Sequence, residues 1–469
     1  MTSPHSPTDE KKYHYDASPA DPEAVVGQID EYDAGEVFRK DADVDFRTVG
    51  WPRASIIFLK IIFATGVLSI PTAMVSLGAV GGALNVIGWS VLNTYTAVIQ
   101  GDFRNRHEKC HSIADMAAEV GGFWMRELCG ALFIIAYVLC SGSGILGVAI
   151  GLNALSTHAA CTVWWSFLAT IVVALAASVR KFQKIGWLTW AGFLSIFTAV
   201  LIVVVAVTTR DRPAAAPATG DYELGYYVIP SGVTFAAGVV ASTTVFVSSA
   251  GTSAFLPVIS EMRNPNDYRK ALFLCMSLVT AAYLAFSLVV YRWCGQWVAS
   301  PSLGSAGQTM KMVAYGVGLI GLIVSACLYL HVAAKYVFVR ILRNSRHLQA
   351  NTVVHWTTWL GCTFGLASLS FILAEAIPIF NYLLALTGSV CFAPLAISLP
   401  GWLWLHDHME WRKGSIVQQI AFWFHVLLIP LGLFFLIGGT YGVIKEIIAA
   451  YADGEIGSAF SCADNSGST

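Results

Sequence analysis

The sequence predicts an all-α polytopic membrane protein with about eleven transmembrane helices. Of its 469 residues, 56% are hydrophobic and only 12% are charged, and the mean hydropathy is +0.63. Soluble domains typically carry about 25% charged residues, so this chain cannot cover its surface with solvated charge. The apolar residues also form long uninterrupted runs rather than helical stripes. Lipid is therefore the expected solvent for most of the chain.

Eleven apolar runs approach the ~20 residues that a helix needs to cross a bilayer. The first is interrupted near Gly66 and Pro71, and the eighth is a long one. Short loops leave no room for a separate soluble domain. In chain order, the expected spans are 54–77, 80–99, 128–155, 163–178, 185–207, 232–259, 272–290, 312–339, 353–373, 377–399 and 416–448.

The distribution of positive charge predicts the orientation of the spans. With the N-terminus inside, 22 of the 28 Lys and Arg residues fall on the inner side, five fall outside and Lys60 lies within a span. This asymmetry favours a cytoplasmic N-terminus. With eleven spans, the tail after Tyr451 is then extracellular, and the plasma membrane is the expected location.

The two ends of the chain differ from the membrane part. Residues 1–50 are polar and rich in Asp, Glu, Pro and Ser, which predicts a disordered cytoplasmic tail without a cleavable signal peptide. Residues 51–450 form the expected membrane domain, and 451–469 a short extracytoplasmic tail.

Composition also argues against several kinds of partner. The net charge of −1 and the pI of about 6.8 give no reason to expect nucleic acid. The ten cysteines show no CxxC spacing and no Cys/His cluster, so no metal site and no cofactor are expected. Cys161, Cys294 and Cys462 fall at outer positions where a disulfide is possible, and spacing alone does not select a pair.

Two spans carry breaks at mid-membrane. The first contains the run IFATGVLSIP at 62–71, and the sixth contains FVSSAGTS at 246–253 with Pro257 one turn later. Broken backbone is tolerated in lipid only where it is buried or lines a cavity. Freed amides at half-helix starts suit a carboxylate, and freed carbonyls suit an ammonium group or a cation. The alternative is a pair of ordinary Gly/Pro kinks, which are common in membrane helices.

Spans one and six are equivalent members of two five-helix repeats. A matched pair of interrupted spans is typical of inverted-repeat transporters, which place their site at the membrane midplane.

The run at 62–71 resembles the first-helix signature of the amino acid/auxin permease family. The stretch FLPVISEMRNP at 255–265 is similar to the end of that family's sixth helix. The resemblance covers about residues 54–448 and is strongest to the fungal neutral amino acid permeases, the branch that contains the N-system amino acid transport protein. It implies eleven helices, the five-plus-five inverted-repeat (LeuT-like) fold and ion-driven amino acid uptake. One departure is Ala64, where the family commonly has Gly.

Transferred by position, the resemblance predicts the site residues. Backbone amides would hold a substrate carboxylate, carbonyls and hydroxyls would hold the amino group, and an aromatic ring would wall or gate the pocket. Tyr137 and Cys140 on the third span can face the same cavity, although packing is their more common role. The residues expected to bind the carboxylate are Thr65, Gly66 and Val67. Those expected to bind the amino group are Ser248, Ser249, Gly251 and Thr252, and the aromatic ring is that of Phe246.

Ionisable residues inside the membrane are candidates for coupling or gating. Lys60 has such a role or extends its stem to the inner surface. His331 can shuttle a proton or make a packing hydrogen bond. Glu261 can pair with Arg263 at the inner end of span six or solvate that end. Further candidates are Ser325, for a cation site, and Lys335, Glu375, His158 and His425, which carry weaker expectations.

The resulting hypothesis is a secondary active symporter that imports neutral amino acids by alternating access. H⁺ is the expected coupling ion, and the sequence does not exclude Na⁺. An amino acid sensor (transceptor) or a vacuolar exporter of the same fold is the alternative. The sequence has no paired acidic motif, His-rich box or Gly-x-Ser-x-Gly elbow, so an enzyme is not expected. It also lacks the repeated filter of a channel.

Overall fold

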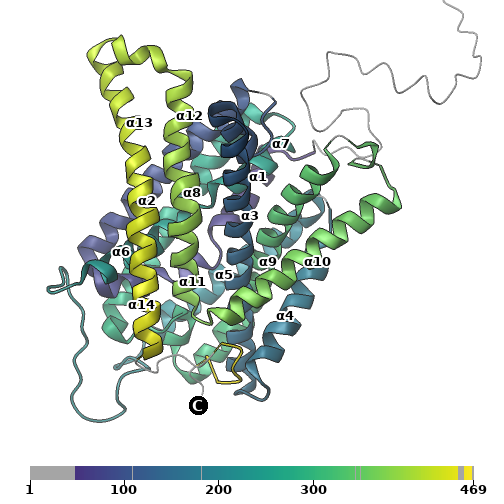
Figure 1. Cartoon of the computed structure of the whole chain (residues 1–469). Coiled ribbons are helices and arrows are strands. Elements are labelled where there is room, and N and C mark those ends of the chain that lie inside the picture. The colour runs from purple at the N-terminus through teal and green to yellow at the C-terminus, as the bar shows by residue number, and fades with distance from the viewer. Residues whose placement is uncertain are drawn as a thin grey trace, which may run out of the picture.

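The computed structural model describes residues 48–452 and 459–466, apart from 108, 181, 344 and 349 and the side chains of 182–186. Figure 1 shows a bundle of long helices running between two faces. The expected N-terminal tail falls almost entirely on residues 1–47, which lie outside the described residues. The described part is helical, with one isolated bridge between Val49 and Met262.

Ten helical segments of the described chain are long and apolar enough to cross a membrane. The shorter apolar helix α4 brings the crossing segments to the eleven that the sequence predicts. The main helices are α1 (Trp51–Ile62), α2 (Ile70–Arg106), α3 (Ile113–Ser156), α4 (Thr162–Ala177), α5 (Phe182–Thr208), α6 (Phe235–Ser249), α7 (Phe255–Ser260), α8 (Tyr268–Cys294), α9 (Gln308–Leu342), α10 (Val353–Ala376), α11 (Phe380–Leu386), α12 (Leu399–Asp407), α13 (Ile416–Phe434) and α14 (Thr440–Ala452).

Several crossings consist of more than one helix. The first comprises α1, the 3₁₀ turn η2 (Gly66–Leu68) and the start of α2. The chain then reverses at Gly78, whose φ of 73° is in the left-handed region that glycine adopts without strain. The remainder of α2 forms the second crossing. The sixth comprises α6, the 3₁₀ turn η3 (Gly251–Ala254) and α7.

The helices pack in two groups. Helix α9 packs against α3, α4, α5 and α10, whereas α2 packs against α6 and α8. Helix α1 lies between the groups, because it contacts α8 as well as α5 and α9. Helix α1 of the first broken crossing therefore lies between the two groups, and α6 of the second broken crossing belongs to the group around α2.

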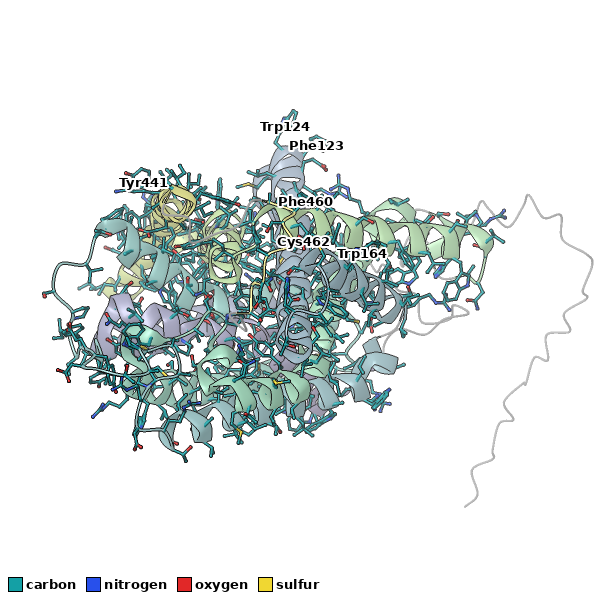
Figure 2. The ribbon with its side chains drawn as sticks, turned by 90° about the horizontal axis from the view of Figure 1, so that it is seen from below. Phe123, Trp124, Trp164, Tyr441, Phe460 and Cys462 are labelled. Carbon is teal, nitrogen blue, oxygen red and sulfur yellow. A yellow bond between two sulfur atoms is a disulfide. The ribbon has the colours of Figure 1, made fainter. Side chains whose placement is uncertain are left out.

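The rim of the molecule is apolar, as expected for a surface that faces lipid. Figure 2 shows aromatic side chains projecting from it. Trp124, near the start of α3, is 82% exposed, and Trp164, near the start of α4, is 66% exposed. Such rings commonly lie at the boundary between lipid and water.

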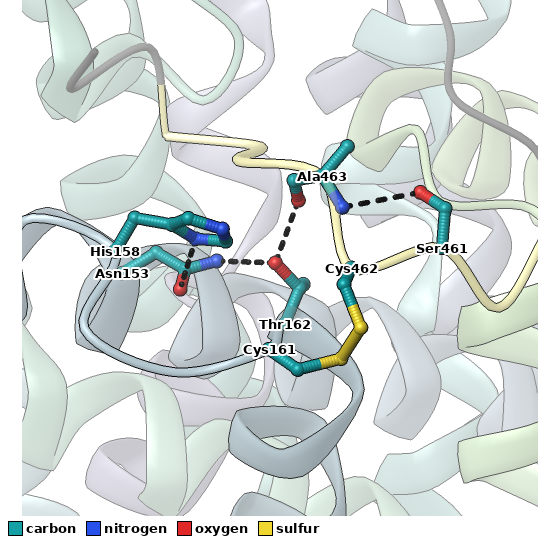
Figure 3. The surroundings of a disulfide bond; sticks show 7 residues. All are labelled: Asn153, His158, Cys161, Thr162, Ser461, Cys462 and Ala463. Carbon is teal, nitrogen blue, oxygen red and sulfur yellow. Dashed lines mark hydrogen bonds between the residues drawn. A yellow bond between two sulfur atoms is a disulfide. The ribbon is translucent and has the colours of Figure 1, made fainter.

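A disulfide joins Cys161, just before α4, to Cys462 in the C-terminal tail (Figure 3). Thr162 Oγ1 donates to the Ala463 carbonyl at 2.7 Å, and Asn153 Nδ2 donates to Asn465 Oδ1 at 2.9 Å. We call the end of the bundle formed by residues 157–161 and 459–466 the disulfide face. The opposite end is the Val49 face, where Val49 forms backbone hydrogen bonds with Glu261 and Arg263 at 3.0 and 2.9 Å.

Of the three cysteines that the sequence left as candidates for a disulfide, Cys161 and Cys462 form the bond, and Cys294 is a buried free thiol. Glu375, near the end of α10, is only 3% exposed, and its carbonyl accepts a hydrogen bond from the Phe460 amide at 3.3 Å. The tail therefore connects the ends of α3, α4 and α10.

We expect Cys462→Ser to lower the thermal stability of the purified protein, because the bond closes a loop of 301 residues. Loss of a disulfide typically costs about 2–4 kcal/mol. Cys161→Ser should cause the same fall in melting temperature, and the double variant should fall no further. Tryptophan fluorescence during heating in detergent measures this. A double variant less stable than either single variant would show that the sulfurs contribute separately.

Candidate binding site at two broken helices

The first break begins where α1 ends at Phe63, whose ψ of 73° is not helical. Pro71 stands at the start of α2 and has no N–H to continue the ladder backward. The local bonds run from Leu68 N to Thr65 O and from Ser69 N to Gly66 O, both at 3.1 Å. The amides of Thr65, Gly66 and Val67 are left outside the α-helical ladder, in a region that is fully buried.

The second break follows α6. Ala250 ends that helix with an N–H···O bond to Val247 at 3.3 Å, and η3 leads into α7. The hydroxyl residues of this stretch are buried: Ser248 is 4%, Ser249 2% and Thr252 1% exposed. The Thr252 Oγ1 has no hydrogen-bond partner within the described residues. A buried unpaired hydroxyl is costly, which is consistent with a position kept for a ligand.

The two breaks touch each other. A Cβ added to Gly66 would lie 2.8 Å from Ser248 Cα and 2.9 Å from Ser248 Cβ. The Ser248 hydroxyl donates to the Gly66 carbonyl at 3.1 Å. The absence of a side chain at Gly66 therefore allows the backbones of the first and sixth crossings to meet. The residues predicted to bind the carboxylate and those predicted to bind the amino group therefore lie next to each other. Their binding roles stay predictions.

Three buried tyrosines bond the carbonyls that the breaks release. Tyr283 on α8 donates to Ile62 O at 2.6 Å and lies 3.0 Å from Ser248 O, so one hydroxyl spans both breaks. Tyr329 on α9 donates to Ile61 O at 2.9 Å, and Tyr137 on α3 donates to Gly251 O at 3.0 Å. Tyr137 is a predicted site residue. Tyr283 and Tyr329 were not predicted, although a polar aromatic residue within an apolar span was an available signal.

An amide side chain completes the second break. Asn93 on α2 donates to Ser249 Oγ at 2.8 Å, while its Oδ1 is buried without a partner among the described residues. This residue was also missed. Phe246 is fully buried and packs on Trp89, with ring centroids 4.9 Å apart. Its gating role stays a prediction.

Lys60 does not extend to a surface. Its side chain is fully buried, and Nζ donates to Ser325 Oγ on α9 at 2.6 Å. The stem passes Gly192 of α5, where an added Cβ would lie 3.0 Å from Lys60 Cε. The interpretation in which the stem reaches the inner face is therefore wrong. Two coupling candidates, Lys60 and Ser325, form one contact that links α1 to α9.

Glu261 pairs with Lys335 of α9 rather than with Arg263. Both partners are buried, and Glu261 is 1% exposed. Arg263 is exposed, and its amide bonds the Val49 carbonyl. A buried pair is costly to break on one side only, because the remaining charge stays in an apolar environment. The pair therefore holds α7 against α9 at the Val49 face.

His331 lies away from the breaks. Its Nδ1 is 3.3 Å from the Ala177 carbonyl, and its ring packs on Trp359 at 5.2 Å. It is thus placed between α9, α4 and α10, in agreement with the packing alternative. Its role in proton transfer stays a prediction.

Three potential metal ligands do meet in the described part of the chain: His107 of α2's end and His406 and Asp407 of α12. This cluster was not predicted, because His107 and the other two residues are about 300 positions apart in the chain. Arg106 lies 3.0 Å from Asp407 Oδ2, and His107 Nε2 is 3.0 Å from Oδ1. The carboxylate is therefore already engaged by a cation, and the group joins α2 to α12 as an ion-pair network.

The fold is shared with solved membrane transporters. The structure of MhsT in complex with L-phenylalanine matches with a TM-score of 0.52, at 12% identity, over 85% of this chain and 97% of that one. The nucleobase–cation symporter Mhp1 also gives 0.52, at 11% identity, over 91% and 98%. These likenesses establish the LeuT-like transporter fold, as the sequence predicts.

The family follows from the sequence of the same region. Residues 47–445 match the family described as "Transmembrane amino acid transporter protein", and the chain belongs to it. A "Transmembrane transporter" of Gibberella moniliformis is 50% identical over 95% of this chain and 94% of its own. The "N amino acid transport system protein" of Neurospora crassa is 26% identical over 90% of both. The predicted family is confirmed, and the protein is an amino acid transporter by family.

Proposed function

We propose that this protein is a secondary active symporter that imports neutral amino acids with H⁺. The observation that carries the proposal is a buried lysine, Lys60, between the broken helix and α9, beside two breaks suited to a zwitterion. The family and its N amino acid transport relative support the substrate class.

The two breaks offer groups of opposite polarity to the two charged ends of a zwitterion. Amides at the start of a helix carry partial positive charge and suit the substrate carboxylate. Those nearest the meeting point are Thr65, Gly66 and Val67. The end of α6 offers carbonyls and hydroxyls, including Thr252 Oγ1, to the ammonium group. The residues of the two breaks themselves, 62–71 and 246–253, carry backbone dipoles and hydroxyls and no formal charge, which favours a substrate of zero net charge.

Lys60 supports coupling to protons. Its Nζ stands between α1 and α9, and an ammonium group there would repel a bound Na⁺. A lysine in an apolar interior can exchange its proton and thereby change the local charge. Protonation would strengthen the contact with Ser325 and hold α1 against α9; release would loosen it. Bound substrate and protonated Lys60 would then both favour the arrangement in which the first crossing is held against α9.

The Val49 face supplies a gate for alternating access. The buried Glu261–Lys335 pair and the Val49 bonds tie the ends of α1, α7 and α9 together. Lys335 also lines a partly open pocket with Ser260 and Arg343 on that side. Separating the pair would connect the breaks to this pocket.

We place the Val49 face in the cytoplasm and the disulfide face outside the cell. Disulfides persist in oxidising compartments, and the Cys161–Cys462 bond fixes the C-terminal tail to the loop before α4. The excess of Lys and Arg on the Val49 side agrees with this orientation. Import at the plasma membrane follows from it.

Uptake into proteoliposomes tests the proposal. A radiolabelled neutral amino acid should accumulate above its external concentration when the outside is acid, and only equilibrate without a gradient. One pH unit is worth about 1.4 kcal/mol per proton, or about tenfold accumulation. A Na⁺ gradient alone should have no effect. Binding without uptake under any gradient would favour the sensor, and accumulation driven by Na⁺ would contradict proton coupling.

A further inference from the structure

A second pocket lies between the breaks and the disulfide face. It has a volume of about 930 Å³, part of it open to the surroundings. Its walls come from the start of α2, from α6, α11 and α14, and from Ser300 in the loop before α9. Thr72 follows Pro71 of the first break directly, and Thr244 precedes Ser248 of the second by one turn. The pocket therefore lies next to the proposed central site.

Glu446 is the one charged residue among those that line this pocket. It lies in the helix of the last membrane crossing, six residues before the end of α14, and is partly exposed. The described part of the chain offers it neither an ion-pair partner nor a hydrogen bond. A carboxylate inside a membrane span is costly and usually faces a cavity where it meets a counter-charge. The Glu446 carboxylate takes no part in the binding site or the gate proposed above.

The pocket also holds unused hydrogen-bonding oxygens. Thr72 Oγ1 and Asn381 Oδ1 are buried, and neither has a partner in the described residues. With Glu446, they are oxygens that can accept hydrogen bonds, as an ammonium group requires. The remaining wall combines apolar side chains, among them Ala237, Val240 and Ile379, with the hydroxyl residues Ser76, Thr244, Ser300 and Tyr382.

This combination selects among cations. The pocket supplies one carboxylate and otherwise neutral oxygens, so its single negative charge matches a monovalent ammonium group better than a divalent cation. The apolar part of the wall can receive the hydrophobic side chain of an organic cation. A negatively charged solute would be repelled by Glu446.

We propose that this pocket is an entry site in which Glu446 binds the α-ammonium group of an incoming amino acid before it reaches the broken helices. The inference rests on the proposed function, because it concerns the same substrate and path. Thr72 and Asn381 orient the ammonium group, and the apolar wall receives the side chain. The substrate carboxylate stays unpaired until it reaches the amides of the first break.

The test compares Glu446→Gln with the wild type and with Asp221→Asn, which removes an exposed carboxylate from the loop before α6. Proton-driven uptake should show a KM about tenfold higher in Glu446→Gln, with the maximal rate within about twofold. Asp221→Asn should match the wild type. In the wild type, the methyl ester of a neutral amino acid should inhibit uptake and the N-acetyl derivative should not. Glu446→Gln should lose the inhibition by the ester.

An unchanged KM together with unchanged ester inhibition would overturn the proposal. A lost maximal rate at constant KM would also overturn it, since Glu446 would then carry the proton instead. Thr72→Val, which alters no charge, should raise the KM about threefold and gives a second measurement if Glu446→Gln does not fold. Wild-type protein that fails to take up amino acids would count against the proposed function, whereas active wild type with an unaltered Glu446→Gln counts only against the entry site.

Discussion

Gly66→Ala should reduce amino acid uptake by at least about a hundredfold, and Gly66→Val should abolish it. The added Cβ would stand 2.8 Å from Ser248 Cα and 3.0 Å from Ser248 Oγ, closer than real Cβ contacts allow. The nearest atom belongs to backbone, so the two breaks must separate. Their separation would displace the amides of the first break and the carbonyls of the second in opposite directions. Uptake into proteoliposomes at equal protein content measures the loss.

Two other glycines provide the controls. A Cβ at Gly88 on α2 would meet nothing within 4 Å, so Gly88→Ala should keep wild-type uptake. A Cβ at Gly251, in the second break, would come no closer than 3.6 Å to Ile62 Cδ1. Gly251→Ala should therefore stay within about threefold of wild type. If Gly66→Ala transported as well as Gly251→Ala, close approach of the breaks would not be needed.

Lys60→Met should uncouple uptake from the proton gradient. The substitution keeps most of the buried volume and removes the ammonium group that binds Ser325 at 2.6 Å. With one pH unit imposed, accumulation should fall from about tenfold to about onefold. Exchange of labelled for unlabelled substrate needs no net proton movement and should stay within about threefold. Comparing accumulation with exchange in the same vesicles separates loss of coupling from loss of binding.

Ser325→Ala and Lys413→Met are the matched controls. Ser325→Ala removes the hydrogen-bond acceptor and leaves the lysine, so accumulation should be reduced and not lost. Lys413→Met removes an exposed lysine before α13 and should have no effect. Full accumulation in Lys60→Met would show that the proton is carried elsewhere, with His331 and Glu261 as the next residues to vary.

The family and the fold class could be read from the sequence because membrane insertion follows local rules. A run of about 20 apolar residues is enough to predict a crossing, and a Gly or Pro inside it predicts a break. The run at 62–71 and the run at 246–253 therefore located both halves of the candidate site. Helix α4, with 16 residues, is shorter than that length, and its continuous apolar run alone predicted it.

Pairings between distant helices could not be read in this way. Lys60 and Ser325 are 265 positions apart, and Glu261 and Lys335 are 74 apart. Which of two nearby cations faces Glu261 depends on the rotation of α7 against α9, and residue spacing does not contain that rotation. A prediction based only on nearness in the sequence therefore paired Glu261 with Arg263.

The sequence by itself determined the solvent, the number of crossings, the positions of the two breaks and the family. The tertiary structure decided that Gly66 meets Ser248, that Tyr283 bonds both breaks, that Cys161 pairs with Cys462 and that Glu446 lines a pocket. The division has a physical cause. Hydrophobic transfer and backbone breaks act on contiguous residues, whereas hydrogen bonds and close contacts between helices exist only after packing has set their rotation and depth.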